Sequence, residues 1–190
     1  ASAWGIDRTD LTEEVLLKDK SLGNSQVLPR DYTRSEEIEV VIREIGSQVA
    51  SRLRAHDKQA WDIYLSIGYS LSTPTEETGF AHSLKLSDSM VDSNLINEQL
   101  MYLFYTYWDG VSPVRRVSVT ATRLADRYGE QLDLFNPPKY DMVKLEDTVD
   151  AIRKRLGKTS IMRASSLEKG GTFIERSQLV GGHAGGQSLE

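Results

Sequence analysis

Small hydroxyl and cationic side chains recur at alternate positions of this sequence, and their chemistry suits contact with a phosphate backbone. Such side chains donate hydrogen bonds to phosphate oxygens without reading base edges. The alternating positions are Ser66, Gly68, Ser70, Ser83, Lys85, Arg116, Ser118 and Thr120. Residues 111–127 add a local excess of cations, with Arg115, Arg116, Arg123 and Arg127 against the acid Asp126. An ordinary solvated sheet face would carry the same residue types, so both interpretations stay open.

A second informative stretch is the pentapeptide Gln131-Leu132-Asp133-Leu134-Phe135, which Asn136-Pro137-Pro138 follows. Spaced apolar side chains on an extended, proline-terminated segment suit a groove, where they act as anchors while the amide bonds at the rim. The alternative is that the segment packs back on its own domain. As a motif the string is specific, because it matches the pentapeptide by which bacterial DNA polymerases and repair proteins bind the sliding clamp.

The remaining composition excludes several kinds of chemistry. The chain has 190 residues, 39% hydrophobic and 27% charged, with a formal net charge of −5. This acidic balance argues against nucleic-acid binding by bulk charge alone, but it leaves room for a local basic strip. There is no cysteine, and His56, His82 and His183 lie far apart. Disulfides, thiol catalysis and a structural zinc site are therefore not expected.

No catalytic constellation is recognisable either. The sequence has no glycine-rich phosphate loop, no Gly-x-Ser-x-Gly turn and no histidine paired with a plausible nucleophile, so we predict no catalytic residue and no metal site. The carboxylate pairs Asp147/Asp150 and Glu36/Glu37 lie in amphipathic patterns, and we interpret them as solvated helix faces. No apolar run approaches the roughly 20 residues that span a bilayer. We therefore expect no membrane partner and a cytoplasmic protein.

Periodicity predicts the elements that must position these residues. Alternation predicts strands over 25–32, 63–70, 80–87 and 113–122, and apolar side chains at three- and four-residue spacing predict helices over 34–56 and 94–107. Thr33 and Glu36 have the spacing of a capping box. The order β-α-β-β-α-β is typical of an α+β fold, a split βαβ arrangement with a four-stranded antiparallel sheet and two helices on one face. Residues 144–156 predict a further helix within a short helical C-terminal extension.

Several pieces of the chain, in this order, resemble the little-finger domain of Y-family DNA polymerases, and most closely its UmuC-like bacterial branch. The pieces are Trp4-Gly5-Ile6-Asp7, Lys20-Ser21-Leu22-Gly23-Asn24-Ser25, Arg52-Leu53-Arg54, Gly79-Phe80-Ala81-His82-Ser83-Leu84-Lys85-Leu86 and Val114-Arg115-Arg116-Val117-Ser118-Val119. The resemblance implies four parts: a thumb exit and linker at 1–19, the little finger at 20–128, a clamp-binding segment at 129–140 and an extension at 141–190. It also implies that the chain is a piece of a longer protein.

The same resemblance implies roles for individual residues. The residues expected to contact primer–template DNA are Lys20, Ser21, Asn24, Ser83, Lys85, Arg115, Arg116, Ser118 and Thr120. At position 82 the family often has a cation, so a phosphate contact by His82 is an open question. The catalytic carboxylates of the family, which bind Mg²⁺, belong to a palm domain, and we expect no cofactor in this chain.

Our hypothesis is thus a non-catalytic part of a lesion-bypass DNA polymerase that grips the primer–template backbone and tethers the enzyme to the sliding clamp. The main alternative is a freestanding α+β module whose open sheet binds another protein and has no nucleic-acid role. The two differ in salt dependence, because only backbone binding should weaken steeply as salt is added.

Overall fold

The computed structural model describes residues 21–71, 77–127 and 138–178. Four strands form one sheet: β1 (Ser21–Tyr32), β2 (Lys58–Tyr69), β3 (Gly79–Met90) and β4 (Val114–Asp126). Two long helices alternate with them, α1 (Ser35–Ala55) and α2 (Ser93–Tyr107). They are followed by α3 (Pro138–Leu156), the short 3-10 turn η2 (Ala164–Leu167) and α4 (Phe173–Ser177). The predicted order of strands and helices is confirmed.

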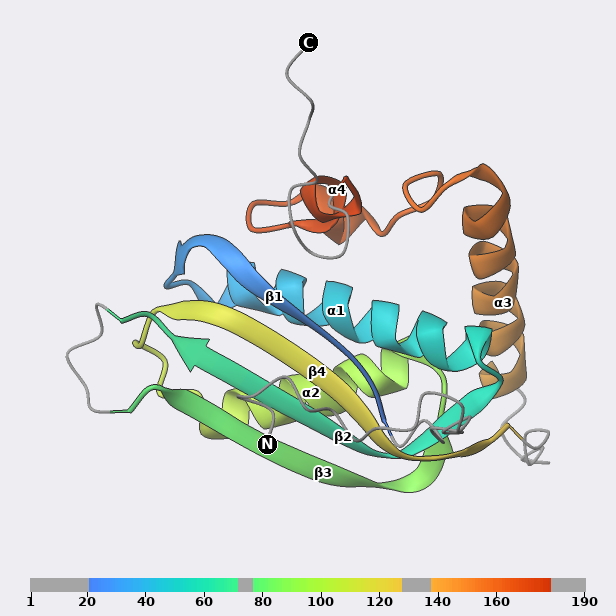
Figure 1. The fold of residues 1–190 in the computed structure, drawn as a ribbon, viewed down its shortest axis with the longest axis horizontal. Coiled ribbons are helices and arrows are strands. Elements are labelled where there is room, and N and C mark those ends of the chain that lie inside the picture. The colour runs from blue at the N-terminus through green and yellow to red at the C-terminus, as the bar shows by residue number, and fades with distance from the viewer. Residues whose placement is uncertain (1–20, 72–76, 128–137, 179–190) are drawn as a thin grey trace, which may run out of the picture.

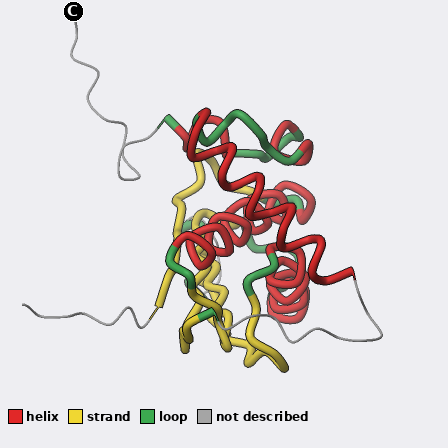
Figure 2. Tube along the Cα trace, turned by 90° about the vertical axis from the view of Figure 1, so that its right-hand side faces the viewer, coloured by secondary structure: helices red, strands yellow, loops and turns green. Residues whose placement is uncertain are grey.

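The sheet is antiparallel with the strand order β1-β4-β2-β3. β4 lies between β1 and β2, and β2 lies between β3 and β4, so each of the two βαβ units is split by a strand of the other. Helices α1 and α2 pack on one face of the sheet, and none of the described helices lies over the other face (Figures 1 and 2). The expected α+β class, with two helices on one side, is therefore confirmed.

The core lies between the sheet and the two helices, and the helical spacing in the sequence identified its members. The apolar positions of α1 that this spacing selects are fully buried: Ile38, Val41, Ile42, Ile45, Val49 and Leu53. Side chains at alternate positions of β2 and β4 meet them, among them Ile63, Leu65, Val117 and Val119. Burying such side chains contributes about 1.5–3 kcal/mol each relative to leaving them exposed. This layer therefore holds the sheet rigid.

Two local expectations about helix starts need correction. The capping box at Thr33 is wrong, because α1 begins one residue later and its N-cap, Arg34, makes no side-chain cap hydrogen bond. Glu36, the other half of that box, instead lies 3.6 Å from the Arg34 guanidinium. The start of α2 carries a cap that the sequence analysis missed: Asp92 accepts hydrogen bonds from the backbone N–H groups of Asn94 and Leu95. An aspartate just before a periodic run is the usual signal for such a cap.

The strands are longer than predicted at several ends, and β1 is the clearest case. It begins at Ser21 rather than at residue 25, because Ser21 pairs with Thr122 on the neighbouring strand β4. Its register shifts between Val27 and Tyr32, the interval that contains Pro29. A proline has no N–H for the ladder, so Pro29 is accommodated by this register shift in the edge strand β1.

The C-terminal extension packs on the helix side of the domain. α3 lies beside the C-terminal end of α1, and the chain then returns over α1 to α4 (Figure 1). The Tyr32 hydroxyl donates a hydrogen bond to the Gly170 carbonyl, and buried Thr172 donates its N–H to Glu44 Oε2 at 3.1 Å. Gly170 has a φ of +102°, and an added Cβ would lie 2.7 Å from Glu37 Cβ, so this return requires glycine.

Candidate nucleic-acid interface

The sheet face opposite the helices is a polar surface whose layout follows from the strand register. Reading across β1, β4, β2 and β3, the rows are Ser21-Thr122-Asp62-Lys85, Gly23-Thr120-Tyr64-Ser83, Ser25-Ser118-Ser66-Ala81 and Val27-Arg116-Gly68-Gly79. None of these residues is buried, whereas their strand neighbours on the other face form the core. We call these four rows the open face.

Hydroxyl groups dominate the open face. Serine and threonine supply them in the first three rows, and Tyr64 adds a phenol as the one aromatic side chain of the four rows. Val27 and the glycines leave the fourth row nearly flat around Arg116. A Cβ added at Gly68 would lie 3.1 Å from Arg116 Cβ, so the missing side chain makes room for the arginine stem. The face is thus a donor surface of hydroxyls around an exposed arginine.

Lys85 and Arg116 are the two cations of the open face. Among the described residues, no ion pair involves Lys85 or Arg116, and both are exposed. The other arginines of the predicted cationic stretch are paired: Arg115 with Asp31 at 3.5 Å, Arg123 with Asp62 at 3.7 Å and Arg127 with Asp147 at 3.3 Å. The cationic surplus that the sequence suggested is therefore concentrated at Lys85 and Arg116.

The residues expected to contact DNA do not all reach the open face. Ser21, Ser83, Lys85, Arg116, Ser118 and Thr120 lie on it, and Lys20 lies outside the described residues. Asn24 is in register with buried Val119 and donates its amide N–H to Gln48 of α1 at 2.5 Å, so it belongs to the helix side. Arg115 sits at a register shift beside Asp31.

Ser70 also differs from expectation, and His82, whose phosphate contact was an open question, lies on the helix side. Ser70, which alternation assigned to this face, lies past the end of β2, and its hydroxyl donates to Asp31 Oδ2 at 2.7 Å. His82 is in register with buried Leu65 and stacks on Tyr107 of α2, with ring centroids 3.5 Å apart. The imidazole therefore packs on the helix side.

The sequence analysis also missed residues of the open face. Ser25, Thr122 and Tyr64 lie in its rows, as does Asp62. Thr122 and Ser25 lie within the predicted strands 113–122 and 25–32, and the same alternation that selects Thr120 indicates them. Asp62 lies one residue before the predicted strand 63–70 and alternates with Tyr64, so a longer strand would place it on this face. Only its position between Thr122 and Lys85 depends on the register of three strands.

The segment Gln131–Phe135 lies outside the described residues, but the elements that bracket it are joined to each other. The backbone N–H of Arg127, just after β4, donates to the Asp57 carbonyl at 3.0 Å. The Arg127 guanidinium reaches the Asp147 carboxylate of α3 at 3.3 Å. Both flanks of the segment are thus attached to the domain close to the C-terminal end of α1.

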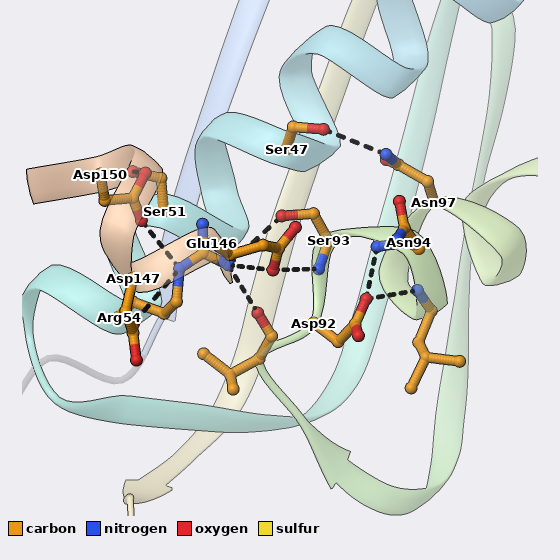
Figure 3. Close-up of polar contacts among 12 residues, drawn as sticks. Ser47, Ser51, Arg54, Asp92, Ser93, Asn94, Asn97, Glu146, Asp147 and Asp150 are labelled. Carbon is orange, nitrogen blue, oxygen red and sulfur yellow. Dashed lines mark hydrogen bonds and ion pairs between the residues drawn. The ribbon is translucent and has the colours of Figure 1, made fainter. Parts of the chain in front are cut away.

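Arg54 is the main connection between α3 and the rest of the domain (Figure 3). Its side chain is only 5% exposed and lies 2.7 Å from Glu146 Oε2 and 2.8 Å from Asp150 Oδ2. It also donates to the carbonyl of Val91 at 2.9 Å. Our interpretation of Asp147/Asp150 as a solvated pair is therefore wrong for Asp150, which accepts a second hydrogen bond from Ser51.

The pair Glu36/Glu37 needs the same correction. Glu37 has a side chain only 5% exposed and accepts a hydrogen bond from Arg30 at 2.6 Å, with Lys169 at 3.6 Å. The hydrogen bond from Arg30 holds the pKa of Glu37 below its usual value, against the opposing effect of burial. This carboxylate therefore fastens β1 and the returning extension to α1.

The part of the chain that the structure describes provides no group of three or more metal-ligating side chains. In the same residues no helix has both the length and the apolar character of a membrane span.

These features define an α+β sandwich with one sheet face uncovered and polar. A family model described as the impB/mucB/samB family C-terminal domain matches residues 19–134. The chain belongs to this family, and the matched residues run from just before β1 to Leu134, within the Gln131–Phe135 segment.

Relatives match nearly the whole chain. UvrX of Bacillus subtilis (strain 168), which is named for UV-damage repair, is 38% identical over 95% of this chain and 43% of its own length. DNA polymerase IV 2 of the same organism is 34% identical over 96% of this chain and 43% of its length. The chain spans less than half of these relatives. A solved complex of the beta-clamp processivity factor with the little finger domain of PolIV is similar over 61% of this chain, at 14% identity and a TM-score of 0.45.

Proposed function

We propose that the open face binds the backbone of primer–template DNA and that the chain serves as the DNA-gripping part of a lesion-bypass polymerase. The observation that carries the proposal is the uncovered, hydroxyl-rich sheet face on which Lys85 and Arg116 have no ion pair among the described residues. Membership of the impB/mucB/samB family and the names of the relatives support the same function.

The geometry of the open face favours backbone contact over sequence reading. Hydroxyls and two separate cations suit phosphate and sugar contacts, which position a protein on DNA without selecting a sequence. The face also lacks paired aromatic side chains on neighbouring strands, the feature with which RNA-recognition sheets stack single-stranded bases. We therefore expect weak binding with little sequence preference and a strong dependence on salt.

The experiment that tests this proposal is a salt titration of binding to a fluorescent primer–template. The double variant Lys85→Ala, Arg116→Ala should bind more weakly, with a plot of log K against log salt that is shallower by about two. The matched control is Lys154→Ala, Arg155→Ala, which removes the same charge from the exposed last turn of α3. A slope that stays the same in the first variant, or that changes equally in both, would contradict the proposal.

We further propose that Gln131, Leu132, Asp133, Leu134 and Phe135 bind the sliding clamp. Support comes from the pentapeptide itself and from the attachment of its two flanks to the domain through Arg127 and α3. The nucleotidyl transfer step would belong to the part of the relatives' length that this chain does not cover. Its Mg²⁺ would be held there, because the described residues offer no set of ligands for a metal.

A further inference from the structure

One acid lies inside the open face, and it is poorly compensated. Asp62 is in register with Thr122 on one side and Lys85 on the other. Its Oδ2 atom lies 3.7 Å from Nε of Arg123, at the long end of an ion pair, and the Arg123 side chain is 60% exposed. Its Oδ1 atom is buried, and no hydrogen-bond partner exists for it among the described residues.

The surroundings of the Asp62 carboxylate offer it little stabilisation. A buried acceptor without a hydrogen bond loses the solvation that it has in the unfolded chain. A partly exposed ion pair at this distance compensates for little of that loss. A buried polar group without a hydrogen-bond partner is typical of a site where function, rather than stability, decides the residue.

We infer that Asp62 is a repulsive charge built into the open face, which limits how tightly the domain holds the DNA backbone. The inference rests on the proposed function, since the phosphates that Asp62 repels are those that Lys85 and Arg116 attract. Asp62 acts in two ways: it repels a phosphate placed over the first row, and it occupies Arg123, which could otherwise contact the backbone. A polymerase that moves along its template needs contacts that release at each step, and loosely held electrostatic contacts permit such sliding.

The size of the effect follows from Coulomb's law. At about 7 Å and an effective dielectric constant of about 40 to 80, removing the repulsion of one phosphate tightens binding roughly threefold to sevenfold. If the neutralised side chain also frees Arg123 for a phosphate, the salt slope steepens by up to about one.

The test compares Asp62→Asn with Glu39→Gln in the primer–template salt titration. Both variants remove one negative charge, but Glu39 lies on α1, on the helix side, where it pairs with Arg43 at 3.7 Å. We expect Asp62→Asn to bind DNA roughly threefold to sevenfold more tightly at low salt and to melt no lower than the parent. Glu39→Gln should leave DNA affinity unchanged.

Each other outcome has a definite meaning. Weaker binding by Asp62→Asn would show that the carboxylate orients Arg123 for contact, and equal tightening by both variants would show that only total charge matters. Either result overturns the inference. An Asp62→Asn variant that binds like the parent also overturns it, provided that Lys85→Ala, Arg116→Ala weakens binding. If that double variant binds like the parent as well, it is the proposed function of the open face that fails.

Discussion

Removing the Arg54 side chain should be the most damaging single polar substitution in the described part of the domain. In Arg54→Ala, Glu146 and Asp150 lose their partner at 2.7 and 2.8 Å, and the Val91 carbonyl loses its donor. Breaking a buried ion pair from one side costs about 3–5 kcal/mol. The two carboxylates are 12% and 20% exposed, so water replaces part of what they lose. We therefore expect a loss of about 2–4 kcal/mol in the free energy of unfolding.

The assay is urea unfolding followed by circular dichroism, with Arg155→Ala as the control. Arg155 is an exposed arginine of the last turn of α3, and no ion pair holds it among the described residues. Its removal should change stability by less than about 0.5 kcal/mol. DNA affinity should be the same in Arg54→Ala as in the parent under conditions where both are folded, because Arg54 lies on the helix side. A loss below about 1 kcal/mol would refute the view that this arginine holds α3 to the domain.

Three further predictions concern pH, the clamp and catalysis. The pKa of Glu37 is lowered from the ordinary glutamate value of 4.5, so the stabilisation that Glu37 provides is complete above that value and is lost as the pH falls through the folded-state pKa. Glu37→Gln should therefore flatten the fall in melting temperature below about pH 4.5, and an acid limb as steep as the parent's would contradict this. The double variant Leu134→Ala, Phe135→Ala should lose about 2–4 kcal/mol of clamp binding in a pull-down or titration. Its melting temperature should not change, and a lowered one with clamp binding retained would favour the alternative that the segment packs on its own domain. The chain alone should extend no primer at any Mg²⁺ concentration. Primer extension by a preparation free of other polymerases would overturn the proposal that nucleotidyl transfer belongs to the part of the relatives' length that this chain does not cover.

The fold could be predicted from the sequence because the local spacing of apolar residues identifies each helix and strand. The spacing of Ile38, Val41, Ile42 and Ile45 allows only a helix with one buried face, and the alternation in β2 and β4 allows only half-buried strands. Since each element has one apolar face, both helices must cover the same side of the sheet. The resemblance to little-finger domains pointed to the same fold, and the family match is consistent with it.

The details of the site could be predicted only in part, because they depend on register and on distant pairing. Alternation placed Ser118 and Thr120 correctly, but it failed at Ser70, which lies beyond a register shift between Gly68 and Tyr69. Asn24 was assigned by resemblance, and the structure turns it toward Gln48 on α1. The contacts of Arg54 with α3 join residues that are 92 and 96 positions apart, and nothing in local periodicity indicates them.

The distribution of charge explains how an acidic chain can have a face suited to DNA. The formal net charge is −5, yet Asp62 is the one acid in the four rows of the open face. Glu37, Glu146 and Asp150 lie on the helix side and are matched there by arginines. Charges are screened beyond about 8 Å at physiological ionic strength. The backbone of the sheet and its core side chains separate the acids of the helix side from the open face. These acids therefore act weakly on a phosphate bound at the open face. The local balance of Lys85, Arg116 and Asp62 should therefore govern binding at physiological salt, and the acidic helix side should matter only as the salt concentration falls.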